Sequence, residues 1–395
     1  MSTAFEDASD PAVWEAIRDV TCRSFAFEGV GEDRWAGWNR FAGIAGRDIF
    51  RALRRNGEVV AALCTYRAGQ WFGGRAVPMG GLAAVAVAPE QRGTGAGRVL
   101  VAEQLRELRT EGIPLATLYA STQALYRAFG FEQAGSCCRW SLPMRDAPIL
   151  GRDLSAERIE LTDPLLRGLH RMRAMSTPGT LDRSDAFWQR LVRAVDKPVY
   201  AYLLGTREDP HGYVIFVANQ REDGLQRLVL RDAVALTHAG LARLWTLLAD
   251  HRSIARELHW QGPSTEPMLL VLPEQQATLE QLERWMLRIV DVPGALAARG
   301  FPADAEAELH LEVSDPLLEG NQGRWLLRVA DGVAEVESGG RGDLQATPRG
   351  LAPLYSGLLR AGDLARLGLV DGTPASLAVA DRLFAGAEPW MADRF

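Results

Sequence analysis

The chain has 395 residues, and at roughly 150 residues per domain this length predicts two or three domains with sizeable cores. Its 47% hydrophobic and 24% charged residues are typical of globular proteins and disfavour disorder, collagen-like repetition and a coiled-coil rod. The net charge of −6 argues against a nucleic-acid partner, because phosphate neutralisation needs clustered basic residues. No stretch approaches ~20 uninterrupted apolar residues and Met1–Ser9 carries no basic residue, so we expect a cytoplasmic protein without a membrane span or a cleaved signal.

Three side-chain types narrow the chemistry further. Lys197 is the single lysine among 44 basic residues, which leaves little material for P-loop or Schiff-base chemistry. The histidines begin at His170 and lack metal-type spacing, so we expect no metal site, and acid–base chemistry before His170 must use another residue type. The cysteines have no C-x-x-C spacing and are expected to be reduced packing residues; they are Cys22, Cys64, Cys137 and Cys138.

The first segment shows a regular series of elements. Asp10-Pro11 predicts the start of an amphipathic helix with Val13, Trp14 and Ile17 on one face. A Gly73-Gly74 hairpin turn is expected between two strands, and a buried strand, a helix and a further strand follow it. The predicted strands are 58–66, a run through 76–78, 82–88 and 115–120, and the helix carries Val101, Leu105 and Leu108 before it stops near Gly112.

From about residue 148 the pattern restarts, and we predict three domains: 1–147, 148–289 and 290–395. The second is expected to hold helices at 163–175, 184–195 and 239–251, with strands at 199–204, 212–219, 226–235 and 257–261. The third is expected to hold a short helix to Arg299, strands at 307–313 and 323–329, and helices at 347–360 and 363–367. The aromatic-rich last residues, Pro389–Phe395, are expected to tuck into the protein, because a solvated tail is normally polar.

The most informative segment is a glycine-rich turn that follows the buried strand at 82–88. It runs Arg92-Gly93-Thr94-Gly95-Ala96-Gly97-Arg98 and opens a helix. Backbone N–H groups of such a turn converge on an anion and the helix dipole adds positive charge, so a pyrophosphate is the natural occupant. The spacing fits neither a Rossmann turn, which needs glycine or alanine at its sixth position, nor a Walker loop, which ends in Gly-Lys-Ser or Gly-Lys-Thr.

This turn, with the Val-x-Val-x-Pro strand before it, resembles the Arg/Gln-x-x-Gly-x-Gly/Ala signature of the GNAT superfamily of N-acetyltransferases. The resemblance implies acetyl-CoA as the acyl donor. Its pantetheine arm would be held by the backbone of Val85, Ala86 and Val87, and its pyrophosphate by the turn from Arg92 to Arg98. The residues that precede the next helix, Ser121 and Thr122, are expected to contact the same molecule.

Tyr126 begins a Tyr-x-x-x-Gly-Phe spacing that is common in this superfamily, where the tyrosine protonates the departing CoA thiolate. A phenol with an unperturbed pKa near about 10 stays protonated at neutral pH and can donate in a dry site. The resemblance therefore makes Tyr126 the expected general acid. The alternative is a core tyrosine with a satisfied hydroxyl.

A closer resemblance covers nearly the whole chain. Two acetyltransferase-like halves, a third domain, the segments 72–81 and 285–292 and an aromatic C-terminus are similar to the Eis (enhanced intracellular survival) aminoglycoside N-acetyltransferases. This implies an α+β protein, with tandem GNAT folds of mixed central sheets flanked by helices, followed by a sterol-carrier-protein-like α/β domain. It further implies a hexamer, and a chain terminus that enters the first domain's active site and supplies its α-carboxylate as the general base, here that of Phe395.

The sequence favours this base independently, because an N-terminal segment without histidine needs a base and the chain ends in a buriable aromatic. A free α-carboxyl has a pKa near about 3.5, which desolvation raises. The alternative role of Phe395 is a hydrophobic plug. The penultimate residue, Arg394, departs from the family pattern. A cation beside the base would partly reverse the rise of its pKa and would repel a polycationic substrate. Asp393 is expected to offset that charge.

A polyamine acceptor needs carboxylates for its ammonium groups and flat rings beside them. The resemblance places these in the first domain, at Phe25, Phe27, Glu28, Trp35 and Trp38, although packing explains most of the aromatics equally well. The expected acceptor is an aminoglycoside, which implies antibiotic resistance, or another polyamine or lysine.

The second half lacks the glycine turn and is expected to bind no CoA and to enclose the acceptor pocket. Two other functions stay open: transfer from another acyl-CoA, and a non-enzymatic CoA- or lipid-binding scaffold.

Overall fold

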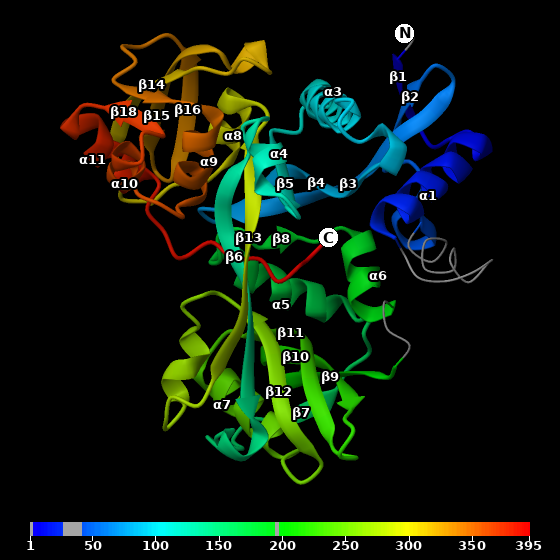
Figure 1. Cartoon of the computed structure of the whole chain (residues 1–395). Helices are drawn as coiled ribbons and strands as arrows, with labels where there is room; N and C mark the ends of the chain where they lie inside the picture. The colour runs from blue at the N-terminus through cyan, green and yellow to red at the C-terminus, as the bar shows by residue number, and fades with distance from the viewer. Residues whose placement is uncertain (1–2, 27–41, 194–196) are drawn as a thin grey trace.

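The computed structural model describes residues 3–26, 42–193 and 197–395. Figure 1 shows three bodies: the N-terminal segment with α1 and α3, the green second segment around α7, and the orange and red third segment. Among the described residues, no helix combines the length and the apolar character needed to cross a membrane.

The first segment follows the predicted order. Asp10 caps the first helix through a hydrogen bond from the Ala12 N–H, and the glycine hairpin turn forms with Gly73 and Gly74 at positive φ. The runs predicted separately through 76–78 and at 82–88 are one strand, because Gly80 and Gly81 continue the ladder with the preceding strand. The elements are β1 Thr3–Asp7, α1 Pro11–Phe25, β2 Phe50–Arg55, β3 Glu58–Phe72, β4 Arg75–Val87, α3 Ala96–Thr110, β5 Leu115–Tyr119, α4 Gln123–Arg127 and β6 Glu132–Pro143.

The second segment also matches its predicted helices and strands to within a few residues. Its elements are β7 Ala156–Arg158, α5 Pro164–Met175, β8 Leu181–Asp182, α6 Asp185–Arg193, β9 Val199–Gly205, β10 Pro210–Gln220, β11 Gln226–Ala235, α7 His238–Ala249, β12 Ala255–Gly262 and β13 Thr278–Ile289. The long strand β13 is absent from the prediction. Its first half is exposed and mostly polar, so it carries little of the apolar signal that identifies a strand.

The two halves share one mixed sheet, which has thirteen strands within the described residues, in the order β1-β2-β3-β4-β5-β13-β6-β12-β11-β10-β9-β7 with β8 beside β3. β13 inserts between β5 and β6, with Trp285 opposite both Tyr119 and Gly135. β6 in turn extends into the second half, where Trp140 lies opposite Trp260 of β12. Strands of each predicted half therefore pair with strands of the other half. The domain limits stay predictions.

The third segment forms a separate five-stranded sheet in the order β16-β15-β14-β17-β18. The helix predicted at 347–360 ends early, because Gly357 takes a left-handed φ of 80°. The elements are α8 Val292–Ala298, β14 Ala307–Val313, β15 Gly323–Ala330, β16 Val333–Ser338, β17 Leu344–Ala346, α9 Pro348–Ser356, α10 Ala361–Arg366, β18 Val370–Gly372 and α11 Pro374–Leu383.

The last residues of the chain return to the junction of the two halves, as predicted from their aromatic character (Figure 1). Ser136 of β6 exchanges backbone hydrogen bonds of 3.0 Å with the residues on either side of Trp390. The Trp390 N–H donates to the Pro178 carbonyl at 3.0 Å, and the Tyr119 hydroxyl donates to the Met391 carbonyl at 3.0 Å. The terminus is therefore anchored to both halves through its backbone.

Candidate active site

Two neighbouring parallel strands separate at the centre of the first half. β4 and β5 pair at three positions, from Met79 opposite Leu115 to Gly81 opposite Thr117. Beyond Gly81, β4 runs on to Val87 without β5 beside it. Backbone N–H and C=O groups on that side of β4 are therefore available to an extended ligand, as along any open strand edge.

β4 also bends inside this open stretch. Its register against β3 shifts between Ala83 and Ala86, where two residues of β4 oppose one of β3, and Ala84 has a φ of 50°. Such a bulge turns backbone groups out of the ladder and is common beside active sites. The residues predicted to bind the pantetheine arm follow directly; they are Val85, Ala86 and Val87. The Val87 carbonyl already accepts a hydrogen bond from the Ser24 hydroxyl at 2.5 Å.

The glycine turn after β4 is shaped to receive an anion. Gly93 and Gly95 have φ values of 79° and 80°, and a Cβ at either position would meet no atom within 4 Å. Gly95 caps α3 without a side-chain hydrogen bond, so the first-turn N–H groups at Ala96, Gly97 and Arg98 have no intrahelical acceptor. Such donors without intrahelical acceptors at a helix N-terminus fit a pyrophosphate.

The basic residues of the turn have separate roles. Arg92 donates to the Ser24 carbonyl at 2.9 Å and so links the turn to the end of α1. Arg98 lines a surface cavity of about 350 Å³ together with Arg106 and Phe129. Arg106 is paired with Glu103 of the same wall at 2.7 Å, so Arg98 and the Phe129 ring are the groups that fit the nucleotide end of a CoA molecule.

Tyr126 lies on α4, which follows β5 at the open end of the separated strands. Its side chain is buried in the cluster that includes Leu82 and Val85, and its ring meets Phe131 edge-on at 5.9 Å. Burial raises the pKa of Tyr126 to about 12, so the phenol keeps its proton at neutral pH. The two residues before α4, Ser121 and Thr122, are exposed.

The ring of Phe395 lies where β4 and β5 part. A Cβ on Gly81 would lie 2.8 Å from its Cε2 atom, so only glycine leaves room for the ring there. The ring centroids of Phe187, Tyr119 and Tyr66 lie 5.7, 5.9 and 6.0 Å away. The chain terminus therefore sits beside the open stretch of β4.

Two ion pairs hold the residues before Phe395. Asp393 accepts two hydrogen bonds of 2.9 Å from Nε of the buried Arg183, which also pairs with Asp232. Arg394 pairs with Glu283 of β13 at 2.9 Å. The expectation that Asp393 offsets Arg394 is therefore wrong, because each of these side chains is paired with a different residue on the sheet or on the β8–α6 segment.

Asp232 anchors this arrangement from β11. Burial alone would raise its pKa, but the positive charges of Arg183 and His170 and hydrogen bonds from Arg183 and Tyr213 outweigh burial and lower the pKa to about 2. The Tyr213 hydroxyl donates to Asp232 at 2.7 Å. The Arg183 side chain is 2% exposed, and sequence reasoning missed its role because nothing distinguishes it among the many arginines of the chain.

Of the five residues expected to line the acceptor pocket, the structure describes one. Phe25 ends α1 and is 42% exposed. The other four lie outside the described residues; they are Phe27, Glu28, Trp35 and Trp38.

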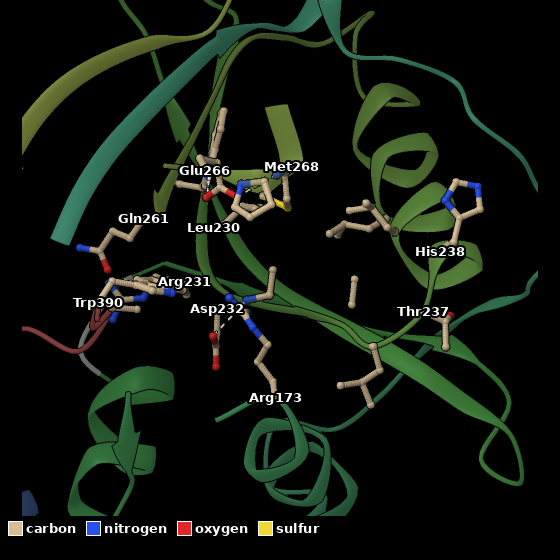
Figure 2. Close-up of a pocket in the computed structure, with 18 residues that line it drawn as sticks. Arg173, Leu230, Arg231, Asp232, Thr237, His238, Gln261, Glu266, Met268 and Trp390 are labelled. Carbon is tan, nitrogen blue, oxygen red and sulfur yellow. Dashed lines mark hydrogen bonds between the residues drawn. The ribbon is translucent and has the colours of Figure 1, made fainter. Parts of the chain in front are cut away.

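A cavity of about 320 Å³ adjoins the chain terminus and is here called the terminal cavity. Its wall includes Phe187, the residues from Ala392 to Arg394, and three arginines of the second half: Arg183, Arg190 and Arg231. A second cavity of about 460 Å³, shown in Figure 2, lies deeper in the second half and shares Arg231, Gln261 and Ala392 with the first. No pattern in the sequence indicated these cavities.

The second half repeats the strand separation without the turn. β11 and β12 pair in parallel as far as Val229 opposite His259 and then part. Only Leu236 and Thr237 connect β11 to α7, and the Thr237 hydroxyl accepts the Gly240 N–H at 3.0 Å, so it occupies the helix N-terminus itself. Figure 2 shows Thr237 and His238 across the second cavity from Trp390.

Comparison with known proteins identifies this architecture. Two acetyltransferase (GNAT) domain families match residues 8–134 and 179–289, and a sterol carrier protein domain family matches residues 292–392. A GCN5-related N-acetyltransferase from Anabaena variabilis, known from its crystal structure, is 39% identical over 100% of both chains with a TM-score of 0.95. The chain belongs to the GCN5-related N-acetyltransferases.

Two further relatives of this acetyltransferase support the assignment. A GCN5-related N-acetyltransferase from Kribbella flavida is 34% identical over 100% of this chain and 98% of its own, with a TM-score of 0.87. The N-acetyltransferase Eis of Mycobacterium tuberculosis is 27% identical over 374 residues, which is 89% of each chain. The predicted fold class and the resemblance to Eis are therefore confirmed, the protein is an acyltransferase, and its GNAT domains imply use of acetyl-CoA.

Proposed function

We propose that this acetyltransferase transfers the acetyl group of acetyl-CoA directly to a primary amine, with the α-carboxylate of Phe395 as base and Tyr126 as acid. The observation that carries the proposal is the position of Phe395 against Gly81, where β4 leaves β5. A chain terminus at that point lies beside the open edge of β4, in the segment before His170 that contains no histidine and where another base is hard to find.

Acetyl-CoA supplies an acetyl thioester, and three groups of residues fit its parts. The open edge of β4 at Val85–Val87 would pair with the amide-bearing pantetheine arm, and its backbone N–H groups would polarise the thioester carbonyl. The glycine turn from Arg92 to Arg98 receives the pyrophosphate, and Ser121 and Thr122 stand at the exposed mouth of the site.

Protons and bonds balance in a single transfer. The acceptor reacts as its free amine, which forms the new C–N bond as the C–S bond breaks, and the Phe395 carboxylate accepts the proton that the nitrogen loses as the amide forms. Tyr126 donates a hydrogen bond and then its proton to the thiolate that leaves. Exchange with solvent then returns a proton to the Tyr126 phenolate and removes one from the Phe395 carboxyl group. Since Tyr126 stays protonated far above neutral pH, it can stabilise the growing negative charge on sulfur throughout the transfer. The reaction requires no metal ion.

The resemblance to Eis makes aminoglycosides, other polyamines and lysine side chains the first acceptors to test, and a hexamer the assembly to test. The second half would enclose the acceptor without binding CoA itself, which the short Leu236–Thr237 connection and the blocked α7 N-terminus support. No role for nucleic acid or membrane follows from the site.

The proposal is tested by thiol release from acetyl-CoA over a panel of aminoglycosides, polyamines and lysine peptides, with the masses of the products recorded. Amine-dependent release together with a mass gain of one acetyl group per event is expected. The same panel with longer acyl-CoAs tests the alternative donor. Binding of acetyl-CoA without turnover on any amine would replace the proposal by the scaffold function.

A further inference from the structure

Among the described residues, the wall of the terminal cavity carries more positive than negative side chains. Most charged side chains on its wall have partners: Arg183 pairs with Asp232 and Asp393, Arg394 with Glu283, and Arg139 with Glu280 at 3.4 Å. Two further guanidiniums, those of Arg190 and Arg231, form no ion pair within the described residues.

Both of these arginines keep buried nitrogen atoms without a hydrogen-bond acceptor. Nη1 of Arg190 and Nε of Arg231 are enclosed and unpaired within the described part of the chain. Arg231 makes one long hydrogen bond, of 3.4 Å from Nη2 to the Leu191 carbonyl. An enclosed guanidinium nitrogen without an acceptor is unfavourable, so a ligand that supplies an acceptor would be stabilised at these two nitrogens.

The two guanidiniums also lie close enough to repel each other. Burial lowers the pKa of Arg231, and the positive charge of Arg190 lowers it further, while Asp393 opposes both effects. Arg190 and Arg231 are neighbouring cations, and the nearby carboxylate of Asp393 is already bound to Arg183. A further carboxylate fits this pair, because a guanidinium group can bind both oxygens of a carboxylate at once.

The cavity is in contact with the residues that surround the proposed base. The guanidinium of Arg190 lies over the ring of Tyr66 at 6.0 Å, and the same ring packs against Phe395 at 6.0 Å and Phe187 at 4.9 Å. Ala392, Asp393 and Arg394 form part of the cavity wall. A small molecule held by its anionic end at Arg190 and Arg231 would therefore lie beside the residues that precede Phe395.

We propose that the acceptor of this enzyme is an amine that also carries a carboxylate, and that Arg190 and Arg231 bind that carboxylate in the terminal cavity. The inference rests on the proposed function, since it assigns the acceptor of the same site. It also separates this chain from the expectation of a polycationic acceptor, because an amine without a carboxylate would leave the guanidiniums of Arg190 and Arg231 without a counter-charge. Arg190 and Arg231 are positioning residues, since they act on the end of the substrate that does not react.

The test compares acceptors that differ by one carboxylate: lysine against cadaverine, and 6-aminohexanoate against 1-aminohexane. We expect KM for the carboxylate-bearing member of each pair to be about tenfold lower or more. R231Q and R190Q should each raise that KM about tenfold, with kcat little changed and with the KM of cadaverine unchanged. R145Q, which alters an exposed arginine directly after β6, is the matched control. Equal KM values within each pair, or arginine variants that weaken both members alike, would overturn the inference.

Binding of hexanedioate, a dicarboxylate that cannot be acetylated, separates this inference from the proposed function. Titration calorimetry should show binding to the wild-type protein and to R145Q, and loss of binding in R190Q and R231Q. If no amine is acetylated but hexanedioate still depends on both arginines, the carboxylate site stands and the proposed function fails. If amines are acetylated while hexanedioate does not bind or binds the variants equally, the carboxylate site is wrong and the proposed function stands.

Discussion

At the scale of single residues, Tyr126 carries the prediction that depends most directly on burial. Its phenol has a pKa raised to about 12, and a general acid contributes roughly a hundredfold or more to the rate. Tyr126→Phe should therefore lower kcat about a hundredfold and leave the KM for acetyl-CoA unchanged, because the ring still fills its place in the apolar cluster. Steady-state kinetics on an accepted amine measure both values.

The pH profile gives a second check on the same residue. A group with a raised pKa keeps its proton until the pH passes that raised value, so loss of the Tyr126 proton should not lower kcat up to about pH 10. An alkaline decline below about pH 10 that disappears in Tyr126→Phe would contradict the raised pKa.

At the scale of elements, the connection from β4 to α3 carries a prediction about the acyl donor. Gly95→Ala puts a methyl group into the open space at the α3 N-terminus, at a φ of 80° that also strains a residue with a Cβ by about 1 kcal/mol. We expect the KM for acetyl-CoA to rise roughly tenfold and kcat to change little.

The chain offers a control with the same backbone strain. Gly112 follows the other end of α3 and has a φ of 73°, and a Cβ at this position would likewise meet no atom within 4 Å. Gly112→Ala should lower the melting temperature about as much as Gly95→Ala does and leave the KM for acetyl-CoA unchanged. A similar rise of KM in both variants would mean that the effect is strain and not contact with the donor.

At the scale of the whole molecule, the terminus depends on three segments that are far apart in sequence. The third segment delivers the last residues, β6 and Pro178 hold their backbone, and Arg183 holds Asp393. Two alanines appended after Phe395 should abolish most activity with little loss of stability, because they displace the carboxylate and leave those anchors intact. Two alanines added before Met1 serve as the control. Full activity of the C-terminally extended chain would remove Phe395 from the mechanism.

The buried network at Asp232 makes a prediction about stability and pH. Because folding lowers the pKa of Asp232 from its ordinary value near about 3.9 to about 2, its carboxylate stabilises the fold by roughly 2 to 3 kcal/mol above about pH 4. This contribution is lost as the pH falls from about 4 through about 2. Urea unfolding at several pH values should therefore show a large gap between wild type and Asp232→Asn at pH 7 that narrows below about pH 4.

An exposed ion pair is the control for this measurement. Asp250 pairs with Arg152 at the surface, where such pairs contribute about 1 kcal/mol or less. Asp250→Asn should differ little from wild type at any pH. A gap of equal size for both variants would contradict the burial argument for Asp232.

Local chemistry in the sequence was enough for much of the fold and part of the site. A carboxylate and proline at the helix start predicted α1, helical signals predicted α5, and the glycine turn predicted the start of α3 and its anion-binding N–H groups. The strands β9 to β12 were also predicted. The polar strand β13 and the late helix α11 were missed, since neither carries a strong periodic signal at its own position.

What the sequence by itself determined is the set of local elements, the acetyltransferase signature and an apolar chain end that needs a place to bury itself. Only the tertiary structure decided that β13 separates β5 from β6, that Phe395 lies on Gly81, and that Arg190 and Arg231 face one cavity. The reason is physical: capping, turns and periodicity act over a few neighbouring residues, whereas these contacts join segments that are distant in sequence. Their energies depend on burial and charge that exist only once the chain has folded.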